Sequence, residues 1–409
     1  MPDLAQPTSD ASAGALVEAG CALLKTYRLD DAIACFERAL SAPEQRVLAC
    51  SGLVSALIAA RRLEAATDVV SRQLALHGQF QAPSVDDLCN RLLWAGRHAE
   101  VAQFLTDNPS IFGYLASHEP DGYHVDALLT YASEIDPALG HVFGDLYAQI
   151  AGRPFAYPEQ LLAEPVDGRT ELLFAAHPYA GGSAFVNLLL LLGVRVDECG
   201  RRHRLLGALD DGHDVWTLRD APDVLPARLL QRVTIFRRDV RCYSFSHRLP
   251  APSALVGRRA VFVVRDPRTA LAARAKPTRD LVESGTFARM AQHQAQDWCD
   301  FVDGIAHVPG ALVIRFEDWK ADPTATARRV LAFADLDLRP SLLAEAVHWS
   351  GTEVARRLRA AVRPVTADAA PVTTEPPATD LDREYALVEA VCGPRLGRYG
   401  YDSRPAPAP

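Results

Sequence analysis

The chain lacks any apolar run long enough to cross a membrane, since a span needs about 18 or more consecutive apolar residues and none occurs. Its first 14 residues lack the basic and then apolar pattern of a secretory signal, so we expect a cytoplasmic protein. Positive charge is not in excess either: 43 Lys and Arg stand against 51 Asp and Glu, which gives a net charge of −8. This balance argues against a nucleic-acid binder or a membrane-surface binder.

Paired cysteines are also lacking. The eight cysteines of the chain form no Cys-x-x-Cys motif, and most lie within apolar patterns. A reduced cysteine in such a pattern acts as a small hydrophobic residue. We therefore expect neither a metal site nor a disulfide framework.

The most informative segment is an apolar run, Leu172–Ala176, followed by the turn His177-Pro-Tyr-Ala-Gly-Gly-Ser-Ala184 and a long apolar stretch. A strand, a glycine-containing turn and a helix start can bind an anion, because free backbone N–H groups and the helix dipole point at it. Ser183 adds a hydroxyl at the first helical turn. The strict P-loop pattern is absent, so a buried strand that turns into a core helix is the alternative interpretation.

Two further blocks follow this turn. Arg259–Arg268 is largely apolar before Arg265-Asp266-Pro267, and Ala311–Trp319 ends on Arg315-Phe-Glu-Asp-Trp319. Together with the turn they resemble the sulfotransferase family, whose members use 3′-phosphoadenosine-5′-phosphosulfate as co-substrate. The resemblance covers about residues 169–402. It implies a parallel-sheet α/β domain of the P-loop-like sulfotransferase fold.

The implied activity is transfer of a sulfuryl group from this donor to a hydroxyl or amine of a small-molecule or carrier-bound acceptor. His247, shortly before Leu249-Pro250, matches the family histidine that removes the acceptor proton, and an imidazole titrating near pH 6.5 suits that task. A surface histidine is the alternative. The residues implied to bind the donor are Tyr179, Ala180, Gly181, Gly182, Ser183, Ala184, Arg265 and Arg274.

The chain departs from the family pattern at the donor site. Tyr179 stands where the family has Lys or Arg, Ala180 replaces a serine, and Ala273 replaces the serine eight residues after Arg265. Loss of a cation beside the leaving oxygen can cost several kcal/mol in the transition state. A replacement would have to come from Arg248, Lys276, Arg237 or Arg238. Arg265, for its part, could instead brace the strand end against Asp266.

These departures keep two other functions open. One is a divergent binding module, or pseudoenzyme, that recruits a partner. The other is a different transferase that uses the same anion pocket. Acceptor identity and oligomeric state are not encoded in any motif of the chain.

Two more patterns limit the chemistry. The carboxylates of Arg315–Trp319 are expected to be architectural, capping backbone groups and pairing with Arg315. The turn also resembles the oxyanion-hole loop of editing thioesterases. That chemistry requires a Gly-x-Ser-x-Gly elbow, which the sequence lacks, so we discount a hydrolase.

Residues 1–150 have helical periodicity throughout. Leu29–Leu40 aligns at an offset of 34 with Leu63–Leu74, and a fainter copy begins near Gly96. This period is similar to that of tetratricopeptide arrays, with an ordinary helical bundle as the alternative. We expect the array to bind a protein partner rather than to perform chemistry.

The remaining segments are connections. Residues 151–168 are expected to be a linker between the two domains, and 363–380 a surface loop. A last helix is predicted over 380–392, and residues 403–409 are expected to be a disordered tail.

Overall fold

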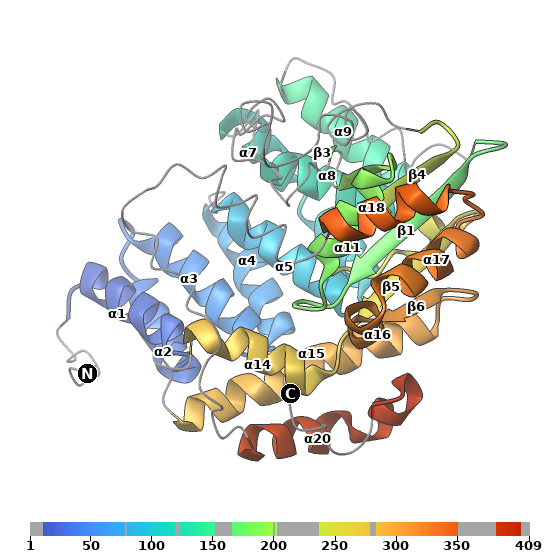
Figure 1. The fold of residues 1–409 in the computed structure, drawn as a ribbon. Helices are drawn as coiled ribbons and strands as arrows, with labels where there is room; N and C mark the ends of the chain where they lie inside the picture. The colour runs from blue at the N-terminus through green and yellow to red at the C-terminus, as the bar shows by residue number, and fades with distance from the viewer. Residues whose placement is uncertain are drawn as a thin grey trace, which may run out of the picture.

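The computed structural model describes residues 11–77, 80–118, 123–151, 166–198, 201–202, 237–278, 284–350 and 382–401. The expected linker falls largely on 152–165, which lie outside these ranges, as do the expected loop at 363–380 and the expected tail at 403–409. Figure 1 shows an N-terminal group of helices beside a parallel sheet with its own helices. The expected mixed architecture, all-helical and then α/β, is confirmed at this level.

The N-terminal part consists of paired helices packed around one apolar core. Consecutive helices contact each other, because the apolar residues of each recur at three and four spacing and must be covered by a neighbour. The helices are α1 (Ala13–Lys25), α2 (Leu29–Ala39), α3 (Arg46–Ala59), α4 (Leu63–His77), α5 (Ala82–Trp94), α6 (His98–Asp107), α7 (Ser110–His118), α8 (Tyr123–Ile135) and α9 (Pro137–Ala151).

The internal repeat coincides with helix starts. α2 and α4 begin at Leu29 and Leu63, where the first two sequence copies begin, and α6 begins at His98, close to the start of the fainter copy near Gly96. Ala32 and Ala66, the small residues of the first two copies, are completely buried. A small side chain at these positions lets the helices of a pair approach closely.

The sheet has the order β3-β2-β4-β1-β5-β6. Its strands are β1 (Thr170–Ala176), β2 (Arg195–Glu198), β3 (Arg201–Arg202), β4 (Val240–Ser244), β5 (Arg259–Val264) and β6 (Leu312–Arg315). All neighbouring strands are parallel except β2 and β3. A parallel sheet is covered on both faces, which is why β1 is buried at every position after Thr170.

Side chains of β1 alternate between two cores. Leu172, Phe174 and Ala176 belong to one cluster, and Leu173 and Ala175 belong to the other. The first cluster is closed by α11 (Gly182–Leu191), α17 (Pro323–Phe333) and α18 (Pro340–Ser350). The second is closed by α15 (Ser284–Ala306) and α20 (Asp382–Leu396). α14 (Pro267–Thr278), α16 (Phe316–Ala321) and the 3₁₀ turns η1 (Pro252–Leu255) and η3 (Gly397–Tyr399) complete the domain.

The C-terminal helix ends later than the sequence predicts. The sequence predicts a helix ending at Cys392, but α20 continues to Leu396 with Pro394 inside it. Cys392 and Leu396 are both buried, so burial of this face in the second core extends the helix past the expected end.

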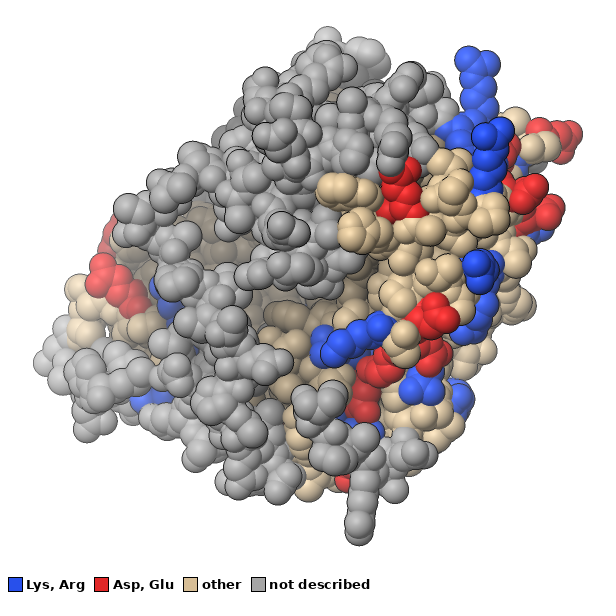
Figure 2. All heavy atoms as spheres, in the orientation of Figure 1, with Lys and Arg blue, Asp and Glu red and all other residues tan. Residues whose placement is uncertain are grey.

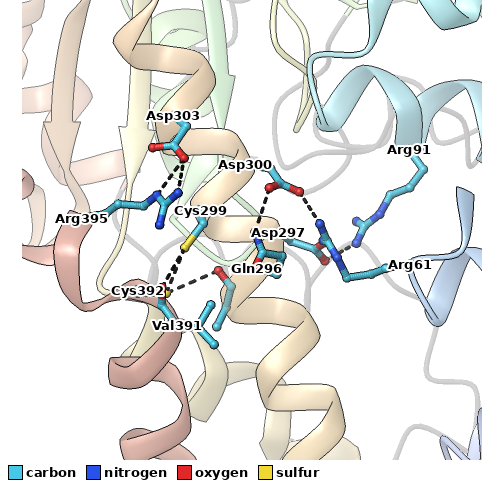
Figure 3. Close-up of polar contacts among 11 residues, drawn as sticks. Arg61, Arg91, Gln296, Asp297, Cys299, Asp300, Asp303, Val391, Cys392 and Arg395 are labelled. Carbon is cyan, nitrogen blue, oxygen red and sulfur yellow. Dashed lines mark hydrogen bonds and ion pairs between the residues drawn. The ribbon is translucent and has the colours of Figure 1, made fainter.

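The helical array lies against α15 through a group of ion pairs. Figure 3 shows two arginines of the array that pair with aspartates of α15. Arg61, in the connection between α3 and α4, pairs with Asp297 and Asp300, and Arg91 of α5 pairs with Asp297. The Tyr27 hydroxyl also contacts His293 Nδ1 at 2.9 Å. On the face seen in Figure 2, acidic and basic side chains of the described residues are interspersed rather than gathered by sign. Among the described helices, none combines the length and the apolar composition that a bilayer span requires.

Candidate functional site

The carboxyl ends of the parallel strands bring the predicted site residues to one edge of the sheet. β1 leads into the 177–184 turn, β4 into His247 and β5 into Arg265, and β2 ends at Glu198. In open α/β sheets, ligands bind outside the carboxyl ends of the strands, where neighbouring connections diverge. The array adds Trp94, at the end of α5, to this edge.

The turn after β1 exposes backbone donors. Tyr179 has φ = 64° and Gly181 has φ = 82°, and the second of these left-handed residues caps α11. The Ala184 amide donates to the Gly181 carbonyl at 3.0 Å, so it is already occupied. The amides of Gly181, Gly182 and Ser183 donate to no backbone acceptor in the described ranges. Three amides at the start of a helix are the arrangement that an anion requires.

The side chains of the turn point in different directions. The Tyr179 side chain is 48% exposed, whereas Ala180 is completely buried in the core beside β1. Ala180 is therefore not accessible to a ligand in this conformation, and its amide already donates to the His177 carbonyl at 3.0 Å. Ser183 is exposed at the start of α11.

Phe316 forms one wall of the turn, which the sequence does not predict. A Cβ placed on Gly181 would lie 2.5 Å from Phe316 Cε2, so the phenyl ring occupies the space that any other residue would need. Phe316 follows β6, within the block that resembles the family, but neither periodicity nor spacing indicates its contact. This close approach and the left-handed φ both explain why residue 181 is glycine.

Arg265 faces the turn. Its Nη1 donates to the Tyr179 carbonyl at 2.9 Å, its Nε donates to Thr269 Oγ1 at 2.9 Å, and its guanidinium lies 4.7 Å from the centre of the Phe316 ring. Burial lowers the pKa of Arg265, and the nearby carboxylates of Glu317 and Asp266 oppose that shift.

The alternative in which Arg265 braces against Asp266 is wrong. Asp266 pairs with Arg268, whose Nη2 lies 2.5 Å from its Oδ2. Arg268 is itself 1% exposed, so the two charges compensate each other in the core.

His247 lies beside the first residue of the turn. Its Nδ1 is 2.7 Å from the Ala176 carbonyl oxygen. A carbonyl only accepts, so Nδ1 carries the proton and Nε2 of the neutral ring carries the lone pair. Burial lowers the pKa of His247, partly opposed by its backbone hydrogen bond and by Glu198, and Arg248 and Arg91 lower it further. His247 is thus a neutral base at physiological pH, in a partly buried position.

The replacement cations expected from the sequence are not at this turn. Arg248 is 1% exposed, and its Nη2 lies 3.3 Å from Glu134 of α8 and its guanidinium 4.4 Å from the centre of the Tyr131 ring. Arg237 and Arg238 precede β4 and so lie at the opposite, amino-terminal edge of the sheet. These three expectations are wrong, because pairing and strand direction place the side chains elsewhere.

α14 carries the predicted donor residue Arg274 and, before it, Ala273 in place of the family's serine. Ala273 is exposed on this helix. Arg274 follows it, and its side chain, like that of Lys276, lies outside the described residues.

The block after β6 is architectural, as predicted. Glu317 Oε1 accepts the Asp266 amide at 3.1 Å, and its Oε2 accepts the Tyr401 hydroxyl at 3.1 Å. Arg315 lies 3.8 Å from Asp318. Glu317 thereby fixes the peptide that follows Arg265.

No protein-family model matches this chain, and no curated protein matches it. Among solved structures it is similar to retinol dehydratase in complex with androsterone and the inactive cofactor PAP, with a TM-score of 0.35 and 14% identity over 59% of this chain and 84% of that chain. Retinol dehydratase with retinol and PAP gives a TM-score of 0.34 with the same identity and coverage. A mutant of Thermobaculum terrenum O-GlcNAc transferase gives 0.25 at 13% identity, over 87% of this chain and 93% of that chain. TM-scores this low carry no functional argument.

Proposed function

We propose that this chain is a sulfotransferase that moves a sulfuryl group from 3′-phosphoadenosine-5′-phosphosulfate to a hydroxyl or amine of a small-molecule or carrier-bound acceptor. One observation carries the proposal: a neutral base and a cation flank the same turn. His247 bonds to the carbonyl of Ala176, and Arg265 bonds to the carbonyl of Tyr179, three residues along the chain. Within the described residues, the amides of Gly181, Gly182 and Ser183 at the start of α11 donate to no backbone acceptor.

The residues of the turn fit an anionic donor. The amides of Gly181, Gly182 and Ser183 would bind the phosphosulfate oxygens, and the Ser183 hydroxyl would add a donor at the first turn of α11. Arg265 would bind the 3′-phosphate of the donor from the β5 side. When bound, the donor supplies the sulfuryl group and a phosphate leaving group.

His247 Nε2 would take the proton of the acceptor hydroxyl or amine. The hydrogen bond from Nδ1 to Ala176 fixes the tautomer that leaves Nε2 free to accept. The lowered pKa of the imidazole keeps it unprotonated near neutral pH.

The N-terminal part would act as a tetratricopeptide-like array that holds a protein partner, such as the carrier of the acceptor. The repeated helix starts at Leu29, Leu63 and His98 support this assignment. Stacked helix pairs leave a concave surface suited to a peptide or a small protein.

Calorimetry with adenosine 3′,5′-bisphosphate tests the proposal. We expect binding by the full chain and at least about tenfold weaker binding by Arg265→Ala, equivalent to about 1.4 kcal/mol. Arg259→Ala is the matched control, because Arg259 lies at the other end of β5 and its Nη1 contacts the Phe333 carbonyl. His247→Ala should retain binding and lose release of the bisphosphate from the donor in the presence of hydroxyl and amine acceptors.

The other two functions predict different results. The absence of the family's cation at Tyr179 and of its serine at Ala273 favours the binding module. Such a module would bind the bisphosphate without turnover, and His247→Ala would change nothing. A transferase with another donor would give no heat with saturating bisphosphate.

A further inference from the structure

The side chain that packs on His247 comes from the helical array. The Trp94 ring, at the last residue of α5, lies 5.1 Å from the imidazole centre at an interplanar angle of 87°. An edge-to-face contact of this kind holds one ring orientation relative to the other. The partly buried histidine of the α/β domain is therefore enclosed by a residue from the other part of the chain.

Trp94 is itself held by Arg91. The Arg91 guanidinium lies 4.7 Å from the centre of the indole ring, and it also pairs with Asp297 of α15 (Figure 3). Arg91 and Trp94 are three residues apart, so they lie on one face of α5. The contacts thus form a series from α15 through Arg91 and Trp94 to His247.

The backbone beyond His247 is also held by the array. The Leu249 amide donates to the Leu93 carbonyl at 3.5 Å, and His98 Nε2 lies 3.0 Å from the Leu249 carbonyl oxygen. Both polar groups of this peptide segment are therefore bonded to α5 and α6. Movement of the array away from the sheet would break these bonds together with the Trp94 contact.

We propose that the helical array completes the site, with Trp94 as a positioning residue that fixes the orientation of the His247 imidazole. The inference rests on the proposed function in taking His247 as the base. It gives the array a role in the chemistry, whereas the sequence indicates only partner binding.

The charges around the His247 imidazole distinguish the effect of removing Trp94 from the effect of removing Arg91. Glu198 of β2 favours the protonated ring, whereas Arg248 and Arg91 disfavour it. Trp94 carries no charge, so its removal changes burial and orientation alone. Loss of Arg91 removes a positive charge as well as the support of the indole.

Nitrogen-15 NMR of the full chain, with labelled histidine and His247→Gln for assignment, tests the proposal. In Trp94→Ala we expect the pKa of His247 to rise toward the ordinary histidine value and the single Nδ1–H tautomer to give way to a mixture. Trp94→Phe should restore the wild-type signals, because it keeps an aromatic ring. Arg91→Gln should shift the signals in the same direction as Trp94→Ala.

Arg289→Gln is the matched control, since Arg289 pairs with Asp30 across the same interface at 3.0 Å without touching Trp94. It should leave the His247 signals unchanged. Unaltered His247 signals in both Trp94→Ala and Arg91→Gln would overturn the inference, as would an equal change in Arg289→Gln. Bisphosphate calorimetry on the wild type judges the proposed function separately: absence of binding would refute the donor assignment and leave the NMR result to decide the position of His247.

Discussion

Gly181→Ala is the substitution whose effect the turn geometry predicts best. An L-residue at φ = 82° costs about 1–2 kcal/mol relative to glycine. The new Cβ would also lie 2.5 Å from Phe316 Cε2 and 2.6 Å from its Cδ2, which forces the ring to move. Overpacking of this kind costs about 1–3 kcal/mol. We therefore expect the free energy of unfolding to fall by about 2–5 kcal/mol in total.

The Phe316 ring also supports Arg265, so the same change should weaken donor binding. The guanidinium lies 4.7 Å from the ring centre, and displacement of the ring removes that contact and tilts Arg265 away from the Tyr179 carbonyl. A loss of about 1.4 kcal/mol would weaken bisphosphate binding tenfold.

Urea unfolding and bisphosphate calorimetry measure the two effects. Gly310→Ala is the control, because Gly310 has φ = 67° and no atom lies within 4 Å of its Cβ position. Its free energy of unfolding should fall only by the cost of the left-handed backbone, about 1–2 kcal/mol. With Phe316→Ala as background, Gly181→Ala should cost no more than Gly310→Ala. Equal losses for the two single glycine substitutions would refute the steric argument.

Two further predictions concern the contacts between the array and the α/β domain. Burial raises the pKa of Glu134 to about 7 from 4.5, despite the opposing charge of Arg248. The folded state then holds this proton more tightly than the unfolded state, so Glu134 lowers stability progressively as the pH rises from about 4.5 to about 7, by up to about 3 kcal/mol. Urea unfolding of Glu134→Gln should show a smaller fall in stability over this range, and an unchanged pH dependence would contradict the assignment. Asp297→Asn should destabilise the interface by about 1–3 kcal/mol, because it removes the negative charge that pairs with both Arg61 and Arg91. Protease cleavage within the array should then accelerate relative to Arg289→Gln, and identical rates would show that the pair contributes nothing.

Local patterns of the sequence predicted much of the fold. The apolar run Leu172–Ala176 is a buried central strand, because a parallel strand covered on both faces has no polar side. The copies at Leu29 and Leu63 mark helix starts, since the period of the repeat is a property of neighbouring residues. The predicted end of the last helix, Cys392, was wrong, because burial of Leu396 depends on α15 and not on the residues around Pro394.

The side chains around the candidate site were predicted less well. The turn, His247 and Arg265 meet at one sheet edge, because strand order and direction follow from alternating strands and helices. Arg248 does not reach the turn, since Glu134 lies closer in the folded protein. Nothing in the sequence indicated the contact between Phe316 and Gly181.

The sequence alone indicated the strand Leu172–Ala176, the glycine turn after it and the helical N-terminal part, because these depend on periodicity and on the backbone freedom of single residues. It also determined that a glycine-containing turn leads from β1 into α11. Only the tertiary structure decided that Trp94 would cover His247 and that Asp297 would hold Arg91. These contacts join residues far apart in the chain, and their pairing follows from how the N-terminal helices pack against α15 and the end of β4 rather than from any local pattern.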